Sequence, residues 1–387
     1  MNRSEPGQAA PLRILHVITG LGPGGAERQL AALALNSDPA RMTHTIVSLR
    51  GGGEWADRLR AGGIEVREIG LINKLLAPLA LPDLVRLIRS RRADLVQTWL
   101  YHADLAGLAA AALTGRPVIW TVRGSQLRLD VYGFETRLLV RLLTRLSNRP
   151  RAIVANAVEG RRWHASIGYR ARHWEVIPNG IDCATFRPDP DARTAVRSEF
   201  GLSENALLVG NLSRHDPMKD HPTLLAAFRP LSDRAWLLLA GDGTGPKNAA
   251  LDRQIVAAGI DPARVLRLGL RSDVPRLLAA LDVAVLSSAF GEGFPNVVAE
   301  AMASGIPSIG TEIGDTARII GDCGIVVAPG DAPSLSAGMA RLLDLDPEAR
   351  AELARRSRER IADRFSIPAM VAAYERLYDR VLAEGKG

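Results

Sequence analysis

Residues 13–36 read RILHVITGLGPGGAERQLAALALN, and this stretch decides the fold class of the chain. It begins with an apolar run typical of a buried strand (13–19) and passes through a glycine-rich turn. It ends in a segment with Leu and Ala at helical spacing (26–36). A strand, a tight turn and a helix in this order are the repeating unit of a parallel α/β sheet.

The same alternation continues along the chain on both sides of an interruption. In the first half we predict strands at 44–49, 64–69, 94–99, 117–124 and 152–157, with helices at 82–92 and 103–113. The segment HWEVIPNGID (173–182) interrupts the pattern with Pro and Gly. Beyond it we predict strands at 206–212, 235–243, 265–270, 283–288 and 306–311, and helices at 221–230, 273–281, 296–305 and 366–385.

Length and composition are those of a globular chain with two domains. A single core rarely exceeds about 250–300 residues, and this chain has 387, of which 47% are hydrophobic and 24% charged. We place the boundary at about residue 175, which predicts two Rossmann-like domains, residues 1–175 and 176–365. Sheets of this kind bind ligands outside the carboxyl ends of their strands, so we expect the site in a cleft between the domains.

Targeting and redox features favour a cytoplasmic location. No apolar run reaches the ~18–20 residues of a membrane span. The N-terminal MNRSEPGQAAPLR lacks the apolar core of a signal peptide. The two cysteines, Cys183 and Cys323, are too few for a disulfide framework or a cysteine zinc site.

Basic residues gather in the first half of the chain. Residues 1–175 carry 25 Lys+Arg against 14 Asp+Glu, a net +11, whereas residues 176–387 carry 24 against 28, a net −4. A basic half is compatible with nucleic acid, anionic lipid or an acidic substrate as partner. Only four of the 49 basic residues are lysine, which an arginine-biased genome explains as well as function does. Such a bias does not explain the asymmetry.

The glycine-rich turn is the first candidate binding element. Gly20, Gly22 and Gly25 satisfy G-x-G-x-x-G between a strand and a helix, where main-chain N–H groups can approach a phosphate. A dinucleotide site also needs an acidic residue at the end of the second strand, and residues 48–53 (SLRGGG) contain none. We therefore favour contact with a phosphate or a sugar, and a plain tight turn is the alternative.

Two further segments of the second half carry charged residues after strands. Arg214 and Lys219 lie five positions apart in NLSRHDPMKDH (211–221), which suits a diphosphate, although two solvated loop cations are the alternative. In FGEGFPNVVAEAMASG (290–305), Glu292 precedes a helix and Glu300 lies within it. Pro295 fits the first helical position, so the helix N-terminus can bind a phosphate between two carboxylates that accept from sugar hydroxyls. A cap and a solvated Glu are the alternative.

Taken together, these motifs resemble those of the retaining glycosyltransferases of family 4. The resemblance rests on GGAER (24–28), PNGID (178–182), AGDG (240–243), the two cations and E-x7-E, and it runs from about residue 12 to the last helix. It implies the GT-B fold, in which the C-terminal helix (366–387) packs back on the first domain. It further implies that the first domain binds the acceptor and the second domain the nucleotide-sugar donor.

The resemblance also implies roles for individual residues. Catalytic roles fall to Glu292, at the hydroxyls of the donor sugar, and to Arg214 and Lys219, at the diphosphate leaving group. Glu300 is expected to hold the nucleotide ribose. The other implied donor-binding residues are Gly22, Gly24, Gly25, Phe294, Pro295, Asn296, Val297 and Gly241, with Leu270 and Arg271 beside the base. The family implies no metal and no cofactor, and the sequence has no Asp-x-Asp element at a strand end.

Two residues of the first half are candidates for acceptor or sugar contact. His102 follows a predicted strand, and a lone His in such a position is more often structural than catalytic. Arg123 stands where many relatives have His, which makes the local hydrogen bonding different from theirs.

The implied reaction moves a sugar from a nucleotide sugar, UDP-linked or else GDP-linked, to a saccharide or lipid-linked saccharide in cell-surface polysaccharide or glycolipid synthesis.

In TRLLVRLLTRLSNRPR (136–151), arginines recur every fourth position among leucines, namely Arg137, Arg141, Arg145 and Arg149. Such a helix suits an anionic membrane surface, and so does the apolar loop 72–82. A core helix with a basic outer face is the alternative. We expect a peripheral association with the inner face of the cytoplasmic membrane.

Three other classes of protein compete with this interpretation. A GT-B sugar-nucleotide epimerase shares the donor site but does not need the apolar loop. A nicotinamide oxidoreductase leaves E-x7-E and the two cations unexplained. A nucleic-acid-binding module requires basic stretches interleaved with aromatic residues, which are absent, so we expect no nucleic-acid partner.

Overall fold

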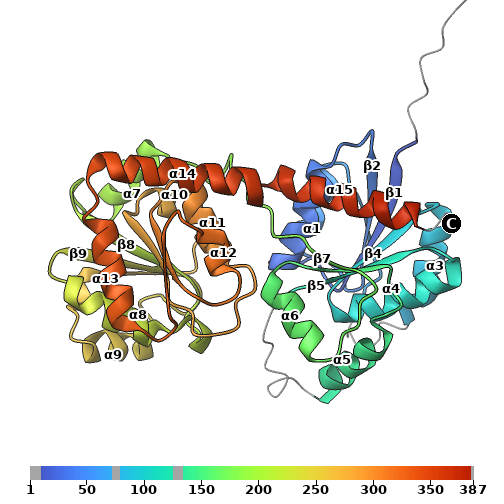
Figure 1. The fold of residues 1–387 in the computed structure, drawn as a ribbon, viewed down its shortest axis with the longest axis horizontal. Coiled ribbons are helices and arrows are strands. Elements are labelled where there is room, and N and C mark those ends of the chain that lie inside the picture. The colour runs from blue at the N-terminus through green and yellow to red at the C-terminus, as the bar shows by residue number, and fades with distance from the viewer. Residues whose placement is uncertain (1–9, 72–78, 125–133, 385–387) are drawn as a thin grey trace, which may run out of the picture. The chain divides into compact units, whose positions relative to one another are not determined.

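The computed structural model describes residues 10–71, 79–124 and 134–384, which form two compact units. Unit 1 contains the described residues up to Arg123, those from 134 to Gly180, and the chain from Met370 onward. Unit 2 contains Ile181–Ala369 and, among the residues described before them, Gly124. Each unit is a parallel sheet with helices on both faces, so the predicted α/β class is confirmed (Figure 1).

Unit 1 holds a seven-stranded parallel sheet in the order β3-β2-β1-β4-β5-β6-β7. Its strands are β1 (Leu12–Ile18), β2 (Met42–Ser48), β3 (Glu65–Glu68), β4 (Leu95–Trp99), β5 (Val118–Val122), β6 (Ala152–Ala155) and β7 (Trp174–Val176). Its helices are α1 (Gly25–Asn36), α2 (Glu54–Ala61), α3 (Leu81–Ser90), α4 (Tyr101–Thr114), α5 (Phe134–Leu146) and α6 (Val158–Ser166). Every residue of β4, β5 and β6 is buried, as expected for strands covered on both faces.

Unit 2 holds a six-stranded parallel sheet in the order β10-β9-β8-β11-β12-β13. Its strands are β8 (Leu207–Leu212), β9 (Ala235–Ala240), β10 (Val265–Gly269), β11 (Val283–Leu286), β12 (Ser308–Thr311) and β13 (Ile325–Val327). Its helices are α7 (Pro190–Glu199), α8 (His221–Phe228), α9 (Ala249–Ala257), α10 (Val274–Ala279), α11 (Asn296–Ala303), α12 (Thr316–Ile320), α13 (Ala332–Leu343) and α14 (Pro347–Phe365), with 3-10 turns η2 (Pro217–Lys219), η3 (Arg229–Leu231) and η4 (Pro262–Arg264).

The core of unit 2 divides between the two faces of its sheet. Val209 of β8 and Leu239 of β9 belong to an apolar cluster with α8, α9 and α13. Their neighbours Leu208 and Leu238 belong to another cluster with α7 and α10. Successive side chains of a strand point to opposite faces, so this alternation buries both sides of the sheet.

The C-terminal helices belong to different units. Helix α14 packs within unit 2, whereas α15 (Ile367–Ala383) joins unit 1 from Met370 onward (Figure 1). On unit 1, the Tyr378 hydroxyl of α15 donates a hydrogen bond to Gln97 of β4, and Arg41 forms an ion pair with Glu375 at 2.8 Å. The expected return of the last helix to the first sheet is therefore present.

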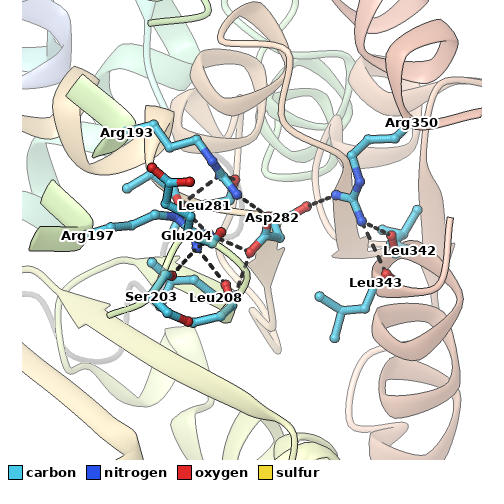
Figure 2. Close-up of polar contacts among 12 residues, drawn as sticks. Arg193, Arg197, Ser203, Glu204, Leu208, Leu281, Asp282, Leu342, Leu343 and Arg350 are labelled. Carbon is cyan, nitrogen blue, oxygen red and sulfur yellow. Dashed lines mark hydrogen bonds and ion pairs between the residues drawn. The ribbon is translucent and has the colours of Figure 1, made fainter. Parts of the chain in front are cut away.

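A buried cluster of charged residues connects helices and strands of unit 2 at the amino ends of its strands. Figure 2 shows Arg193 and Arg197 of α7 directed at the carboxylate of Asp282, which precedes β11, at 2.7 Å each. The same carboxylate accepts the N–H of Leu208 at 2.7 Å, and Arg350 of α14 donates to the Asp282 carbonyl at 2.9 Å. Asp282 thereby joins α7, β8, β11 and α14 through one side chain and one carbonyl.

Two local predictions are corrected. Helix α5 ends at Leu146, so Arg149 lies beyond it. The reason is Pro150, because the residue before a proline is disfavoured in helical conformation. Pro295 is the N-cap residue of α11, and Asn296 occupies the first helical position. Most of the apolar loop predicted at 72–82 lies outside the described residues.

Candidate active site

Each sheet reverses its strand order once, at β1/β4 in unit 1 and at β8/β11 in unit 2. Such switch points open a crevice at the carboxyl ends of the two strands, because the connections after them leave to opposite sides. The predicted residues Arg214 and Lys219 follow β8, and Glu292 follows β11. These three charged residues therefore lie in the loops at the switch point of unit 2.

The loops after β8 and β11 are joined to each other by short polar contacts. The Ser287 hydroxyl donates to the Lys219 carbonyl at 2.7 Å, and the Ala289 N–H donates to the Met218 carbonyl at 2.9 Å. Gly291 has φ +79°, and a Cβ built on it would lie 2.7 Å from the Met218 sulfur. The loop that carries Lys219 is therefore held against the loop that carries Glu292.

Lys219 and Glu292 form an ion pair between the lysine Nζ and the carboxylate Oε1. Their side chains are only 13% and 9% exposed, so this is a nearly buried pair. The Ser288 hydroxyl donates to the same carboxylate oxygen at 2.6 Å. A cation and a carboxylate are thus brought together from segments 73 positions apart in the chain.

The loop after β12 supports Glu292 from its main-chain side. The Asp315 N–H donates to the Gly293 carbonyl at 2.9 Å. Gly314 has φ +61°, and a Cβ there would lie 2.5 Å from the Glu292 carbonyl oxygen. Only a glycine permits this close approach, which fixes the backbone of Glu292.

Helix α11 begins directly after this loop. Its N-cap Pro295 provides no side-chain hydrogen bond to the first turn, and the first N–H groups of a helix favour an anion. Phe294 is 6% exposed and packs against Phe365 in a tilted arrangement with ring centroids 5.6 Å apart, which anchors the helix start. Glu300 is the fifth residue of α11 and is 6% exposed. One carboxylate therefore precedes the helix and a second lies within it, as the sequence predicts.

The other predicted residues of unit 2 have different surroundings. Arg214 is 57% exposed and pairs with Asp216 at 3.3 Å, so it does not join the buried pair of Lys219. Gly241 has φ +144°, and a Cβ there would lie 2.3 Å from the Ser213 carbonyl oxygen, which brings the β9 and β8 loops together. Leu270 is 80% exposed. Arg271 forms a bidentate ion pair with Asp273, with both N–O distances at 2.7 Å, and this contact raises the pKa of Arg271.

In unit 1 the predicted glycine loop follows β1 at the switch point. Gly24 is the N-cap of α1, and a Cβ on it would lie 2.0 Å from Oε2 of Glu27. Glu27 is the third helical residue, the position from which a Glu side chain folds back over the cap. A Cβ on Gly22 or Gly25 would meet nothing within 4 Å, so the main chain there is open to a ligand.

Arg123 follows β5 and is engaged within unit 1. Its guanidinium lies 4.8 Å from the ring centroid of Trp99 and donates to Asn179 Oδ1 at 2.5 Å. Burial lowers its pKa, while the carboxylate of Glu27 acts in the opposite direction. The Nε of Arg123 is buried without a hydrogen-bond partner. His102, the second residue of α4, is half-buried.

Several functional candidates escape prediction from sequence. Ser288 contacts Glu292, but a serine pair after a strand carries no distinctive pattern. Glu27 belongs to the motif GGAER, and its position three residues after Gly24 is the sequence signal that could have indicated a contact with the helix cap. Asp104 of α4 is fully buried, which raises the pKa of its carboxyl, and it accepts from the Thr98 hydroxyl at 2.5 Å. Its other oxygen has no partner.

The described part of the chain contains no group of three or more His, Cys, Asp or Glu residues arranged to hold a metal ion. Within the same residues, no helix combines the length and the apolar character needed to cross a bilayer.

Two family models match the chain, one on each half. The model described as Glycosyltransferase Family 4 matches residues 23–185, and the model described as Glycosyl transferases group 1 matches residues 203–345. The first model begins within the glycine loop and includes Gly24 and Gly25, and the second covers the Lys219–Glu292 pair and α11. The sequence resemblance to this family is thereby confirmed.

Individual relatives agree with the family models. EpsF of Bacillus subtilis (strain 168) is 27% identical over 311 residues, which cover 77% of this chain and 78% of EpsF. The UDP-Gal:alpha-D-GlcNAc-diphosphoundecaprenol alpha-1,3-galactosyltransferase of Escherichia coli is 26% identical, over 64% of each chain. Two other curated relatives are matched over only 50% and 52% of their own length. Among solved structures, Anabaena Alr3699/HepE in complex with UDP has a TM-score of 0.82 at 24% identity, over 95% of this chain and 100% of HepE.

Proposed function

Because the chain belongs to glycosyltransferase family 4 and has the GT-B fold, we propose that it transfers a sugar from a nucleotide sugar to a saccharide or lipid-linked saccharide, with retention of anomeric configuration. A UDP-sugar is the favoured donor and a GDP-sugar the second choice. HepE was solved with UDP, and the name of the Escherichia coli relative specifies UDP-Gal as donor.

One observation carries this proposal. At the switch point of unit 2, the Lys219–Glu292 pair adjoins the start of α11, which also carries Glu300. A cation and helix N–H groups suit a diphosphate, and carboxylates suit the hydroxyl groups of a ribose and a hexose. A nicotinamide dinucleotide also contains a diphosphate and riboses, so it is the family match that supports a glycosyltransferase over an oxidoreductase.

Within this proposal each residue has a chemical role. The acceptor hydroxyl attacks the anomeric carbon, the bond from that carbon to the leaving phosphate oxygen breaks, and this oxygen takes the acceptor proton. Lys219 and Arg214 stabilise negative charge on the departing diphosphate. Glu292 accepts from hydroxyls of the donor sugar, and Glu300 accepts from the ribose. The main-chain N–H groups of Phe294, Asn296 and Val297 and the glycine loop orient phosphate and sugar. Gly241, Leu270 and Arg271 stay proposed donor-binding residues, and His102 and Arg123 stay candidates for acceptor contact.

The donor assignment is tested by incubating the purified chain with a panel of UDP- and GDP-sugars and measuring nucleotide release. We expect release from one base class, accelerated by a lipid-diphosphate-linked saccharide, and an NMR spectrum of the product with the anomeric configuration of the donor. Interconversion of the sugar nucleotide without any acceptor would favour the epimerase instead. NADPH binding without nucleotide release would favour the oxidoreductase.

Helix α5 supports the lipid-linked acceptor because it exposes an apolar ridge beside a basic ridge. The apolar ridge comprises Phe134 (69% exposed), Leu138 (55%) and Leu142 (40%). The basic ridge comprises Arg137, Arg141 and Arg145, all exposed. A helix with this composition suits the interface of an anionic membrane, where its apolar side chains and its cations are both accommodated.

Sedimentation with vesicles tests this membrane contact. Each arginine near an anionic surface contributes on the order of 1 kcal/mol, weakened by salt. We expect the chain to pellet with phosphatidylglycerol vesicles at low salt and not with phosphatidylcholine vesicles. Substituting Glu for Arg137, Arg141 and Arg145 should abolish pelleting, whereas the exposed Arg86→Glu and Arg162→Glu changes in α3 and α6 serve as charge controls. Equal pelleting of both variants would remove α5 from the membrane contact.

A further inference from the structure

A groove of about 940 Å³ opens in unit 1 at the amino ends of its strands. Its lining includes Leu12, the first residue of β1, together with Asp94, Pro117 and Arg151, which directly precede β4, β5 and β6. The glycine loop and Arg123 lie at the carboxyl ends of the same strands. A seven-residue strand such as β1 is about 20 Å long. The groove is therefore separate from the candidate active site.

The floor of the groove is apolar. It is built by three helices that contribute Leu105 and Leu108 from α4, Leu146 from α5, and Val381 and Leu382 from α15. None of the described residues that line the groove is aromatic, so they offer no platform on which a nucleotide base would stack. An aliphatic chain is the ligand that such a floor suits.

The rim of the groove is strongly basic. The described residues of its lining include four arginines, Arg116, Arg149, Arg151 and Arg172, and one acidic residue, Asp94. Both carboxylate oxygens of Asp94 accept from Arg13, at 2.8 and 3.0 Å, so Asp94 is already neutralised. Among the described residues, no carboxylate forms an ion pair with any of the four rim arginines. Arg172 donates to the Asn148 carbonyl at 2.8 Å, and Arg116 interacts electrostatically with Asp94. Guanidinium groups without a carboxylate ion pair, set around an apolar floor, suit the phosphate of an amphiphile.

Helix α5 connects this groove to the surface proposed above to contact a membrane. The exposed ridge Phe134, Leu138, Leu142 has four-residue spacing, and the next residue at that spacing is Leu146, in the groove floor. We infer that the groove binds one anionic phospholipid, with the phosphate among the rim arginines and one acyl chain on the leucine floor. The inference rests on the proposed membrane contact only for the source of the lipid, because binding of the amphiphile itself does not require a membrane.

Calorimetry with a soluble probe tests the groove directly. We expect dodecyl phosphate, below its micellar concentration, to bind with one-to-one stoichiometry. Shortening the alkyl chain should weaken binding about fourfold for each CH₂ removed. Dodecyl maltoside, which has the same chain and a neutral head, and inorganic phosphate, which has no chain, should each bind at least tenfold more weakly. Equal binding of inorganic phosphate and dodecyl phosphate would overturn the assignment of the floor to an alkyl chain.

Two variants test whether dodecyl phosphate binds in the groove, one by reversing charge at the rim and the other by filling the space. Arg116→Glu with Arg149→Glu reverses charge at two exposed rim positions, and Ala112→Trp fills the groove from the exposed side of α4 without changing charge. Each should weaken dodecyl phosphate binding at least tenfold, whereas the charge control Arg86→Glu with Arg162→Glu should leave it unchanged. Unaltered binding in both groove variants would overturn the proposal.

Vesicle binding separates this inference from the membrane contact of α5. The groove variants should reduce pelleting with phosphatidylglycerol vesicles, and the α5 triple variant should retain dodecyl phosphate binding. If the groove variants lost dodecyl phosphate but bound vesicles like the native chain, a bilayer phospholipid would be the wrong ligand. If the α5 variant lost vesicle binding and kept dodecyl phosphate, the groove would stand independently of the membrane contact of α5.

Discussion

Replacing Lys219 with Met separates two roles that the lysine can have, one in the reaction and one in the fold. The substitution keeps the aliphatic stem and removes the cation that pairs with Glu292. Breaking a fully buried ion pair by removing one partner costs about 3–5 kcal/mol. The two side chains here are 13% and 9% exposed, and Ser288 still donates to the carboxylate. We therefore expect a loss of unfolding free energy near the lower limit, about 2–3 kcal/mol.

The double variant Lys219→Met with Glu292→Gln removes both charges and keeps an acceptor for Ser288. Because no charge is then left unpaired, its unfolding free energy should return to within about 1 kcal/mol of the native value. Activity should not return. If Lys219 stabilises the departing diphosphate, losing that charged hydrogen bond costs about 1.5–3 kcal/mol, a fall in kcat/KM of roughly 10- to 150-fold in the single variant. The double variant should fall at least as far, because it also alters Glu292, the proposed contact of the donor sugar.

The assay combines urea unfolding with the rate of nucleotide release, measured on the native chain and both variants. Lys247→Met, which changes an exposed lysine of the same unit, is the matched control and should alter neither quantity. The critical result is the double variant. If it regained kcat/KM along with stability, Lys219 would be a structural partner of Glu292, and the catalytic assignment would be wrong.

Three further predictions concern the affinity for UDP, the stability of unit 2 and the dependence of the stability on pH. Glu300→Gln should weaken UDP binding in calorimetry by about 1–3 kcal/mol, the range for charged hydrogen bonds, and an unchanged affinity would refute the ribose contact. Asp282→Asn should lower the urea stability of unit 2 by about 3 kcal/mol, because Arg193 and Arg197 lose their counter-ion (Figure 2); a midpoint equal to that of the native chain would contradict this. Burial lowers the pKa of His44, His164 and His221 to about 4 each, below the value of about 6.5 in unfolded chains. Between pH 6.5 and pH 4 these histidines bind more protons in the unfolded chain than in the folded one. The free energy of unfolding is therefore unaffected by them above pH 6.5 and decreases as the pH falls toward 4, by at most about 1.4 kcal/mol per pH unit for each histidine. Equal urea midpoints at pH 7.5 and pH 5 would disprove this pH dependence.

Periodicity predicts the central strands and the helices with apolar faces. The strand predicted at 206–212 is Leu207–Leu212, and the helix predicted at 296–305 is Asn296–Ala303. Both succeed because buried parallel strands and packed helices require long apolar signals bounded by Gly or Pro. The differences of one or two residues lie at the ends, where boundaries are least defined.

Helix α14 shows where periodicity fails. It has 19 residues, yet only Ser357, Ile361 and Phe365 are buried, so its apolar stripe is too weak to recognise. The helix is held instead by arginines that donate to main-chain carbonyls, as Arg358 does to Ala303 at 2.5 Å and Arg360 to Ile319 at 2.8 Å. Such contacts depend on tertiary structure and leave no periodic pattern.

Spacing predicts the candidate site only where its residues are neighbours in the chain. Glu292 and Glu300 lie before and within one helix, as their separation requires. The pairing of Lys219 with Glu292 depends on β8 and β11 being adjacent, which spacing does not contain. The prediction that Arg214 and Lys219 converge treated one loop as a unit, whereas the turn η2 separates a buried lysine from an exposed arginine.

Arg123 illustrates how a buried charge at a candidate site is accommodated by its surroundings. A guanidinium carries a permanent charge, and a buried charge is unfavourable without partners. Here Trp99 supplies a π face, Asn179 supplies an acceptor and Glu27 supplies an opposing carboxylate beside the glycine loop. Because Glu27 also folds over the Gly24 cap, the charge at residue 123 acts on the loop proposed to hold the donor. The consequence of Arg123 for sugar binding is therefore expected through the orientation of Glu27 and that loop, in addition to any direct contact.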